Sequence, residues 1–214
     1  MDELVRWLGA EAHENARWMG WNTLLALVPA AIALLLFRPG FRSGRRPGPA
    51  WWVGATLFLL FLPNAPYVLT DVVHLVADVR EESSDAVVLA GVLPVYGAFF
   101  ATGLGAYVLC LRRISRFLVE HGWDPPRRVA AELVLHGVSA VGIYLGRGPR
   151  LSSWDAVLDP ARTMSGLGGL LRPVPLAATV AVFAGLLVAT AVVRVLLDAT
   201  AELAHRHLGP LRPA

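Results

Sequence analysis

Apolar residues in this chain come in long blocks, and short arginine-rich segments separate the blocks. Five of the blocks approach the roughly 20 residues that cross a bilayer as a helix. They are residues 18–37, 47–70, 86–110, 129–146 and 174–193. The pattern predicts an all-α fold, a polytopic transmembrane helical bundle of about five spans. The fourth block is the weakest candidate, because it contains Glu132 and His136.

The second block is interrupted by Pro63 and Pro66. Proline lacks an amide hydrogen and disfavours a helical conformation in the residue before it, so we expect the second span to break here. Irregular backbone at this depth persists only where protein or a water-filled cavity covers it. Asn64 is expected to cap a new short helix, with Pro66 in the first turn of that helix.

The placement of arginine predicts the orientation in the membrane. The chain has no lysine, and the segments 38–50, 111–128 and 194–214 together hold 12 of its 19 basic residues. Loops rich in positive charge remain on the cytoplasmic side, so the N-terminus is expected outside and the C-terminus in the cytoplasm. The predicted organisation is an extracytoplasmic segment at 1–17, a transmembrane domain at 18–197 and a cytoplasmic tail at 198–214.

Polar residues follow the broken span at spacings of three and four, which places them on one helix face. They are Asn64, Tyr67, Asp71, His74 and Asp78. Asp71 and His74 are the candidate catalytic residues, since a carboxylate and an imidazole one turn apart can relay a proton or ligate a metal. Two ligands are too few to predict a metal site. A helix that shows its polar face to solvent is the alternative, and it is our expectation for Asp78.

A second polar cluster follows the fourth span. It contains Arg147 and Arg150, and a planar guanidinium suits carboxylates and phosphates. The simpler interpretation, which we favour, is an internal ion pair with Asp71 or Asp155 together with contacts to lipid headgroups. Trp154 is also typical of an aromatic anchor at the membrane surface. The candidate ligand-binding residues are therefore Asn64, Tyr67, Arg147, Arg150, Trp154 and Asp155.

Composition excludes several classes of function. Of the 214 residues, 56% are hydrophobic and 16% charged, and the mean hydropathy is +0.56. No polar stretch is long enough to build a soluble catalytic domain. The positive charge lies at loop ends, so it does not predict a nucleic-acid partner. Cys110 is the single cysteine and cannot form an intrachain disulfide, and no cofactor is indicated.

Small residues recur at four-residue spacing in three of the predicted spans. Such stripes let helix backbones approach closely in lipid. We expect them to serve packing within the chain rather than a dimer, and the oligomeric state is not predicted. The stripes are Gly97–Ala101–Gly105, Gly142–Gly146 and Ala177–Ala181–Gly185–Ala189.

The segments 61–75 and 142–155 resemble two signature stretches of a bacterial membrane family, number thirteen-sixty-one in the series of domains of unknown function. The resemblance covers most of the chain from the second span onward and implies a polytopic inner-membrane protein without an established activity. The chain departs from the family pattern at Gly148-Pro149, where two large apolar residues are usual. It departs again after Tyr96, where relatives tend to carry aspartate.

Three functional hypotheses remain. The favoured one is a non-catalytic accessory or scaffold protein, whose polar face binds a membrane lipid, an anionic lipid headgroup or a partner helix. The second is an interfacial enzyme that acts on a lipid or lipid-linked anionic substrate, with Asp71 and His74 handling protons and Arg147 and Arg150 holding the anion. The third is a small transporter, which is disfavoured because little charge lies within the membrane.

Glu132 and His136 lie four residues apart on one face of the fourth span. Ionisable residues within a membrane are candidates for function. We nevertheless expect a structural role, in which Glu132 reaches Arg127 or Arg128 and His136 forms a hydrogen bond to a neighbouring helix.

Overall fold

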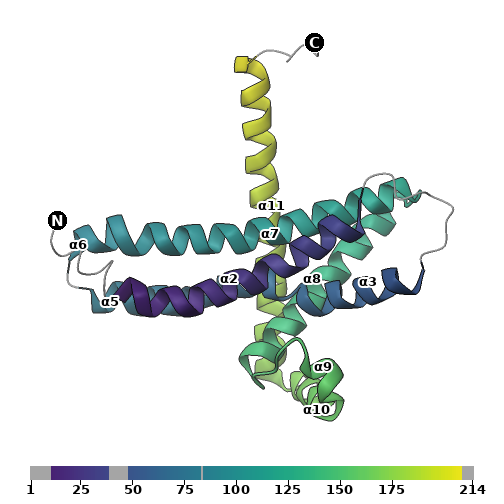
Figure 1. Ribbon diagram of the computed structural model, residues 1–214, viewed down its shortest axis with the longest axis horizontal. Coiled ribbons are helices and arrows are strands. Elements are labelled where there is room, and N and C mark those ends of the chain that lie inside the picture. Colours follow the sequence, from purple (N-terminus) through teal and green to yellow (C-terminus); the bar gives the residue numbers. More distant parts are fainter. Residues whose placement is uncertain (1–10, 39–47, 83, 209–214) are drawn as a thin grey trace.

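The computed structural model describes residues 11–38, 48–82 and 84–208, and in these ranges the chain is helical and contains no strand. The longer α-helices are α2 (Glu11–Leu36), α3 (Pro49–Phe61), α5 (Val72–Glu81), α7 (Leu93–Glu120), α8 (Pro125–Arg147), α10 (Pro160–Leu170) and α11 (Pro173–Leu208). The short elements are α4 (Asn64–Tyr67), the 3₁₀ turn η1 (Val68–Asp71), α6 (Asp85–Val87), the π-helical segment η2 (Val88–Val92) and α9 (Asp155–Leu158). Figure 1 shows their arrangement.

Five helical stretches in the described residues are long and apolar enough to cross a membrane. They are Asn15–Leu36, Pro49–Glu81, Asp85–Glu120, Pro125–Arg147 and Pro173–Leu203. Each overlaps one of the five apolar blocks in the sequence, so the predicted all-α bundle of a multi-pass membrane protein is confirmed. The stretches extend past the apolar blocks because helices continue until a capping or turn residue ends them, whatever the polarity of the last turns.

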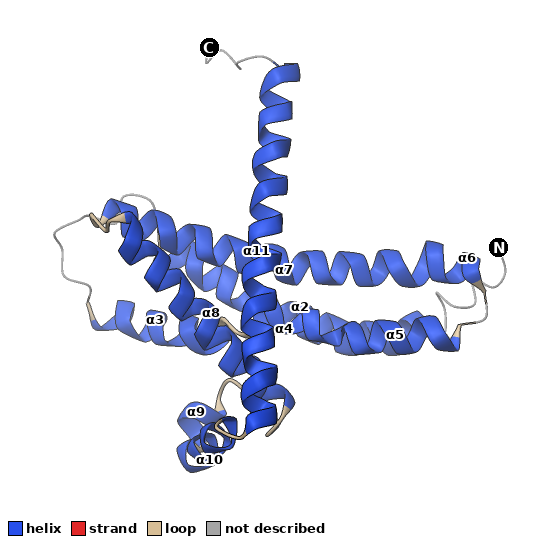
Figure 2. Cartoon of the chain, turned by 180° about the vertical axis from the view of Figure 1, so that it is seen from behind, coloured by secondary structure: helices blue, strands red, loops and turns tan. Residues whose placement is uncertain are grey.

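The core lies where α2, α3, α7 and α8 meet. Its most buried side chains include Phe58, Leu62, Tyr107 and Cys110. A second cluster, which includes Val68, joins the segment after α4 to α2 and α7. In both views α2 and α7 run side by side (Figures 1 and 2). The burial of these apolar side chains between helices brings α4 and η1 into the centre of the molecule.

The last helix is placed differently from the others. In both views α11 crosses α7 steeply, and its C-terminal half extends beyond the remaining helices (Figures 1 and 2). Val188, Val192 and Val195 on this helix are more than half exposed. Because lipid tails are as apolar as these side chains, a bilayer covers such a surface at no cost.

The second span breaks where the prolines predict it. α3 ends at Phe61, and a helical path resumes at Asn64 through α4, η1 and α5. The expected capping role of Asn64 is wrong, because Pro63 occupies the N-cap position and no side chain caps α4. The backbone at Pro63 already has right-handed helical torsion angles, so no new helix start is formed and the Asn64 side chain makes other contacts.

The small residues pack only in part as expected. A Cβ atom on Gly142 would lie 2.4 Å from the Pro63 ring, and one on Gly146 would lie 3.0 Å from the Tyr67 ring, so this pair does bring α8 close to the broken span. The other two stripes face outward, since Cβ atoms on Gly105 and Gly185 would meet nothing within 4 Å. The expectation that these two stripes serve packing within the chain is wrong.

Candidate functional site

A pocket of about 570 Å³ lies among α2, the break between α3 and α4, α8 and the segment after α8. Apolar side chains form much of its wall, among them Leu25, Leu59, Val138 and Val141. Its polar lining is uncharged throughout: Asn22, Asn64, Tyr67, Ser152, Ser153 and Thr163. Ligand sites typically combine an apolar wall with a few convergent polar groups, so this pocket is the candidate site.

The polar lining gathers at one end of the pocket. On α2, Asn22 precedes the apolar Leu25 by about one turn. On the broken span, the apolar Leu59 lies within α3 and Asn64 lies after the break. Asn64 donates a hydrogen bond of 2.8 Å to Ser153, which follows the C-terminus of α8. The polar end therefore lies beside the C-terminus of α8, and the apolar part extends along the helices toward Val138.

Trp154 closes part of the same wall. Its ring packs edge-on against Phe61 at 4.9 Å between ring centroids, and the residue is 51% exposed. Asn64 is held in place by a second hydrogen bond of 3.0 Å from its amide to the Phe61 carbonyl oxygen. The structure thus brings together Asn64, Tyr67 and Trp154 of the predicted ligand-binding residues.

Asp71 and Arg147 form an ion pair beside this pocket. Asp71 is only 2% exposed, and it also accepts a hydrogen bond of 3.3 Å from Asn22. Arg147 donates to the Thr70 hydroxyl at 2.8 Å, and its guanidinium lies 4.7 Å from the centre of the Tyr67 ring. The two polar segments of the sequence do meet, and Asp71 is the internal partner of Arg147.

His74 and Asp78 follow Asp71 along α2, where the three residues contact Trp18, Asn15 and Asn22 respectively. The His74 ring is exposed and packs 5.0 Å from the Trp18 ring. Asp78 accepts hydrogen bonds of 2.9 Å from Asn15 and 2.8 Å from Tyr96. The expectation that Asp78 only faces solvent is therefore wrong. The three partners lie on one face of α2, so the shared face predicted for Asp71, His74 and Asp78 is present in the structure.

The remaining predicted residues lie after α8. The Asp155 carboxylate accepts a hydrogen bond of 2.6 Å from the backbone of Ser152, so it positions the segment that lines the pocket. Arg150 is exposed and has a positive φ of 57°. No ion pair is found for Arg150 among the described residues.

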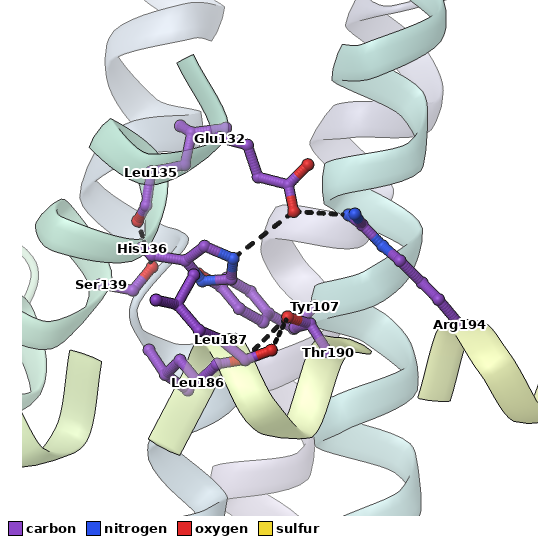
Figure 3. Close-up of polar contacts among 9 residues, drawn as sticks. All are labelled: Tyr107, Glu132, Leu135, His136, Ser139, Leu186, Leu187, Thr190 and Arg194. Atoms are coloured by element: carbon purple, nitrogen blue, oxygen red, sulfur yellow. Dashed lines mark hydrogen bonds and ion pairs between the residues drawn. The ribbon is translucent and has the colours of Figure 1, made fainter. Parts of the chain in front are cut away.

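A second polar network lies where α7, α8 and α11 cross (Figure 3). His136 is completely buried, and its Nδ1 lies 2.9 Å from the Tyr107 hydroxyl. Its Nε2 lies 3.6 Å from Glu132, which forms a 2.7 Å ion pair with Arg194 of α11. The expected hydrogen bond from His136 to a neighbouring helix is confirmed. The expected partners of Glu132 were wrong, since Arg194 takes the place of Arg127 and Arg128.

Several residues that form these polar contacts could not be predicted from a sequence pattern. Asn22 and Tyr107 are isolated polar residues in apolar helices, and Thr70 and Arg194 lie far along the chain from the groups they bind. The rarity of polar groups within a span was the one available signal for Asn22. Among the described residues, no group of three or more His, Cys, Asp and Glu could hold a metal ion.

Comparisons with known proteins identify a family for this chain. No match to the chain is found among the curated proteins or among the solved structures. The sequence model of one family, described as "Protein of unknown function (DUF1361)", matches residues 21–193. This range includes the pocket, the Asp71–Arg147 ion pair and Glu132 with His136, while Arg194 is the first residue beyond it. The match covers most of the chain, which therefore belongs to that family of unknown function.

Proposed function

We propose that this protein is a non-catalytic accessory protein of the bacterial cytoplasmic membrane that binds one lipid molecule in the pocket beside α8. The observation that carries the proposal is the gradient of the lining, which is polar and uncharged near Asn64 and Ser153 and apolar toward Val138. A lipid has the same gradient, with ester or hydroxyl groups at one end and hydrocarbon at the other.

The size of the pocket fits part of such a molecule. Its volume of about 570 Å³ lies within the range of roughly 300–1,000 Å³ that is usual for small-molecule sites. The amide of Asn64 and the hydroxyls of Ser152 and Ser153 supply donors and acceptors for ester or hydroxyl oxygens. Hydrocarbon would occupy the wall formed by Leu59 and Val141, where it exchanges one apolar environment for another.

The geometry favours binding over proton transfer. Asp71 is buried and neutralised by Arg147, so its charge already stabilises the fold. His74 packs against Trp18 and does not line the pocket. A general acid or base must reach the reacting group within hydrogen-bond distance, and the candidate catalytic pair does not converge on the pocket wall.

The arginine distribution favours an extracytoplasmic position for the polar end of the pocket. The loops 38–50 and 111–128 are the richest in arginine and would be cytoplasmic. The C-terminus of α8 is one span away from 111–128, so Ser152 and Ser153 would lie at the opposite membrane surface. The site would take its lipid from the outer leaflet.

A pocket-filling variant tests the proposal. Val141→Trp places an indole in the pocket, and Val180→Trp adds the same group to an exposed position on α11, where Val180 is 57% exposed. We expect lipid to co-purify with the wild type and with Val180→Trp but not with Val141→Trp, as measured by mass spectrometry of intact protein from detergent. Thermal unfolding would verify that both variants fold.

The opposing outcomes are distinct. Wild-type protein without bound lipid, or equal lipid content in all three proteins, would overturn the proposal. A co-purified membrane helix that Val141→Trp releases would assign the pocket to a protein partner. A lipid that the purified wild type converts into a new species, with loss of conversion in Asp71→Asn, would favour the interfacial enzyme.

A further inference from the structure

The pocket lining has no charged side chain that could pair with a charge on the ligand. Each polar side-chain group in the wall is an amide, a hydroxyl, a phenol or an indole, and none of them is charged. A charged group would lose its hydration there without an opposite charge in compensation. Any headgroup charge must therefore lie at the rim, beside the segment that follows α8.

Two arginines flank this rim. Arg150 directly precedes Leu151, which lines the pocket, and Arg162 directly precedes Thr163, which lines it from α10. The Arg162 guanidinium donates a hydrogen bond of 3.4 Å to the carbonyl oxygen of Pro149, the residue before Arg150. Both cationic residues thus lie next to the polar end of the pocket.

The acidic residues nearby are already engaged. Asp71 is bound to Arg147, and the Asp155 carboxylate accepts from the Ser152 backbone. Asp159 accepts a hydrogen bond of 3.0 Å from the Arg162 backbone, as the cap of α10. Within the described residues, neither Arg150 nor Arg162 forms an ion pair.

The backbone holds Arg150 in an unusual conformation. It is the one residue other than glycine with a positive φ in the described part of the chain. The next residue is fixed by a 3.0 Å hydrogen bond from its amide to the Leu145 carbonyl oxygen. Left-handed torsion angles in a residue with a Cβ are unfavourable and cluster at ligand-binding and active sites, so the conformation of Arg150 supports a role in ligand recognition.

We propose that the bound lipid carries a phosphate group and that Arg150 and Arg162 bind this phosphate at the rim of the pocket. The inference rests on the proposed lipid-binding function and names the headgroup chemistry. Guanidinium groups pair with phosphate oxygens through two parallel N–H donors. The hydrocarbon and ester region occupies the uncharged pocket, and the phosphate stays at the membrane surface.

The test compares phosphatidic acid with diacylglycerol of the same acyl chains, which differ only in the phosphate. Binding to purified protein in neutral detergent is measured by displacement of a fluorescent lipid. We expect the wild type to bind phosphatidic acid about tenfold more tightly than diacylglycerol, since charged hydrogen bonds supply an increment of that order. The preference should weaken as salt is added, because the rim is exposed to solvent.

Variants assign the preference to the two arginines. The double variant Arg150→Gln/Arg162→Gln should bind both lipids alike, with its affinity for diacylglycerol unchanged. Arg80→Gln removes another exposed arginine, on α5 and outside the pocket lining, and should keep the full preference. Arg150, Arg162 and Arg80 are all exposed, so the double variant and the control should unfold at the wild-type temperature.

The outcomes separate this inference from the function on which it rests. Absence of binding to either lipid would overturn the lipid-binding function itself. Equal binding of both lipids by the wild type, or a preference that survives in the double variant, would overturn only the phosphate assignment. Displacement of the fluorescent lipid by inorganic phosphate alone, as effectively as by phosphatidic acid, would overturn the assignment of the phosphate to a lipid.

Discussion

Asp71 and Arg147 lie 76 residues apart in the sequence and form an ion pair in which the carboxylate is almost completely buried. The pair joins the turn η1 to the C-terminus of α8, and so connects the broken second span to the segment that lines the pocket. Its role is to position the site. Removal of one partner leaves the other charge unpaired, whereas removal of both leaves no unpaired charge.

Loss of Arg147 should destabilise the protein. Arg147→Gln leaves the buried Asp71 carboxylate without its cation. Breaking a buried pair costs about 3–5 kcal/mol, and because Arg147 is about one-third exposed, we expect roughly 2–3 kcal/mol. Thermal unfolding in detergent measures the loss. The double variant Asp71→Asn/Arg147→Gln should be more stable than Arg147→Gln, and a double variant that is less stable would contradict a structural role for the pair.

Asp78 should contribute to stability through its two hydrogen bonds. Asp78→Ala leaves Asn15 and Tyr96 without their acceptor, and an unsatisfied buried group costs about 1–3 kcal/mol. Glu81→Ala, at an exposed position of the same helix, is the control and should unfold at the wild-type temperature. Tyr96→Phe removes one of the two bonds and should give an intermediate loss. If Asp78→Ala were as stable as the wild type, Asp78 would have only the solvent-facing role that the sequence predicted.

Two glycines on α7 should respond in opposite ways to alanine. A Cβ atom on Gly103 would lie 2.0 Å from Val68 and 2.6 Å from the Ala65 carbonyl oxygen, so Gly103→Ala should cost about 1–3 kcal/mol by overpacking. A Cβ atom on Gly105 would meet nothing within 4 Å, so Gly105→Ala should be neutral or stabilising by up to about 1 kcal/mol. Equal stability of the two variants would mean that α7 does not pack closely on the broken span.

The Glu132–Arg194 ion pair should couple α8 to α11. A double-mutant cycle of Glu132→Gln and Arg194→Gln should show an interaction free energy of about 1 kcal/mol or more, because the two residues are in direct contact and partly buried. The exposed pair of Glu202 and Arg206 on α11 is the matched control. Its cycle should give about 0.3–0.5 kcal/mol, as is usual for exposed pairs. Additive effects at Glu132 and Arg194 would show that α11 is held by apolar packing alone.

The arginine asymmetry predicts the topology. Reporters fused after Ser43 and Arg116 should signal cytoplasm, and reporters fused after Glu82 and Asp159 should signal the extracytoplasmic side. Alkaline phosphatase and green fluorescent protein fusions measure the two locations in a complementary way. A cytoplasmic signal after Asp159 would mean that α8 does not cross, and the proposed outer-leaflet lipid site would then lie on the wrong side of the membrane.

The apolar blocks, Pro63 and the arginine-rich loops were sufficient to predict the helical class, the five candidate spans and the break after Phe61. These features depend on local physics. A span needs about 20 apolar residues, and proline interrupts a helix wherever it stands. The meeting of Asp71 with Arg147 was one of two pairings that the sequence left open, since a guanidinium near a membrane surface requires an anion and two carboxylates were available.

Only the tertiary structure decided the contacts between helices. A periodic pattern shows which residues share a face, but it does not show which helix covers that face. Tyr67 packs against Gly146 of α8 and His74 packs against Trp18 of α2, and their spacing alone did not show these partners. The pairing of Glu132 with Arg194 likewise depends on the crossing of α11 over α7 and α8. The uncharged lining of the pocket depends on the packing of α2 and α8 around the broken span. Such crossings are set by the summed packing of many side chains, and no local stretch of sequence determines them.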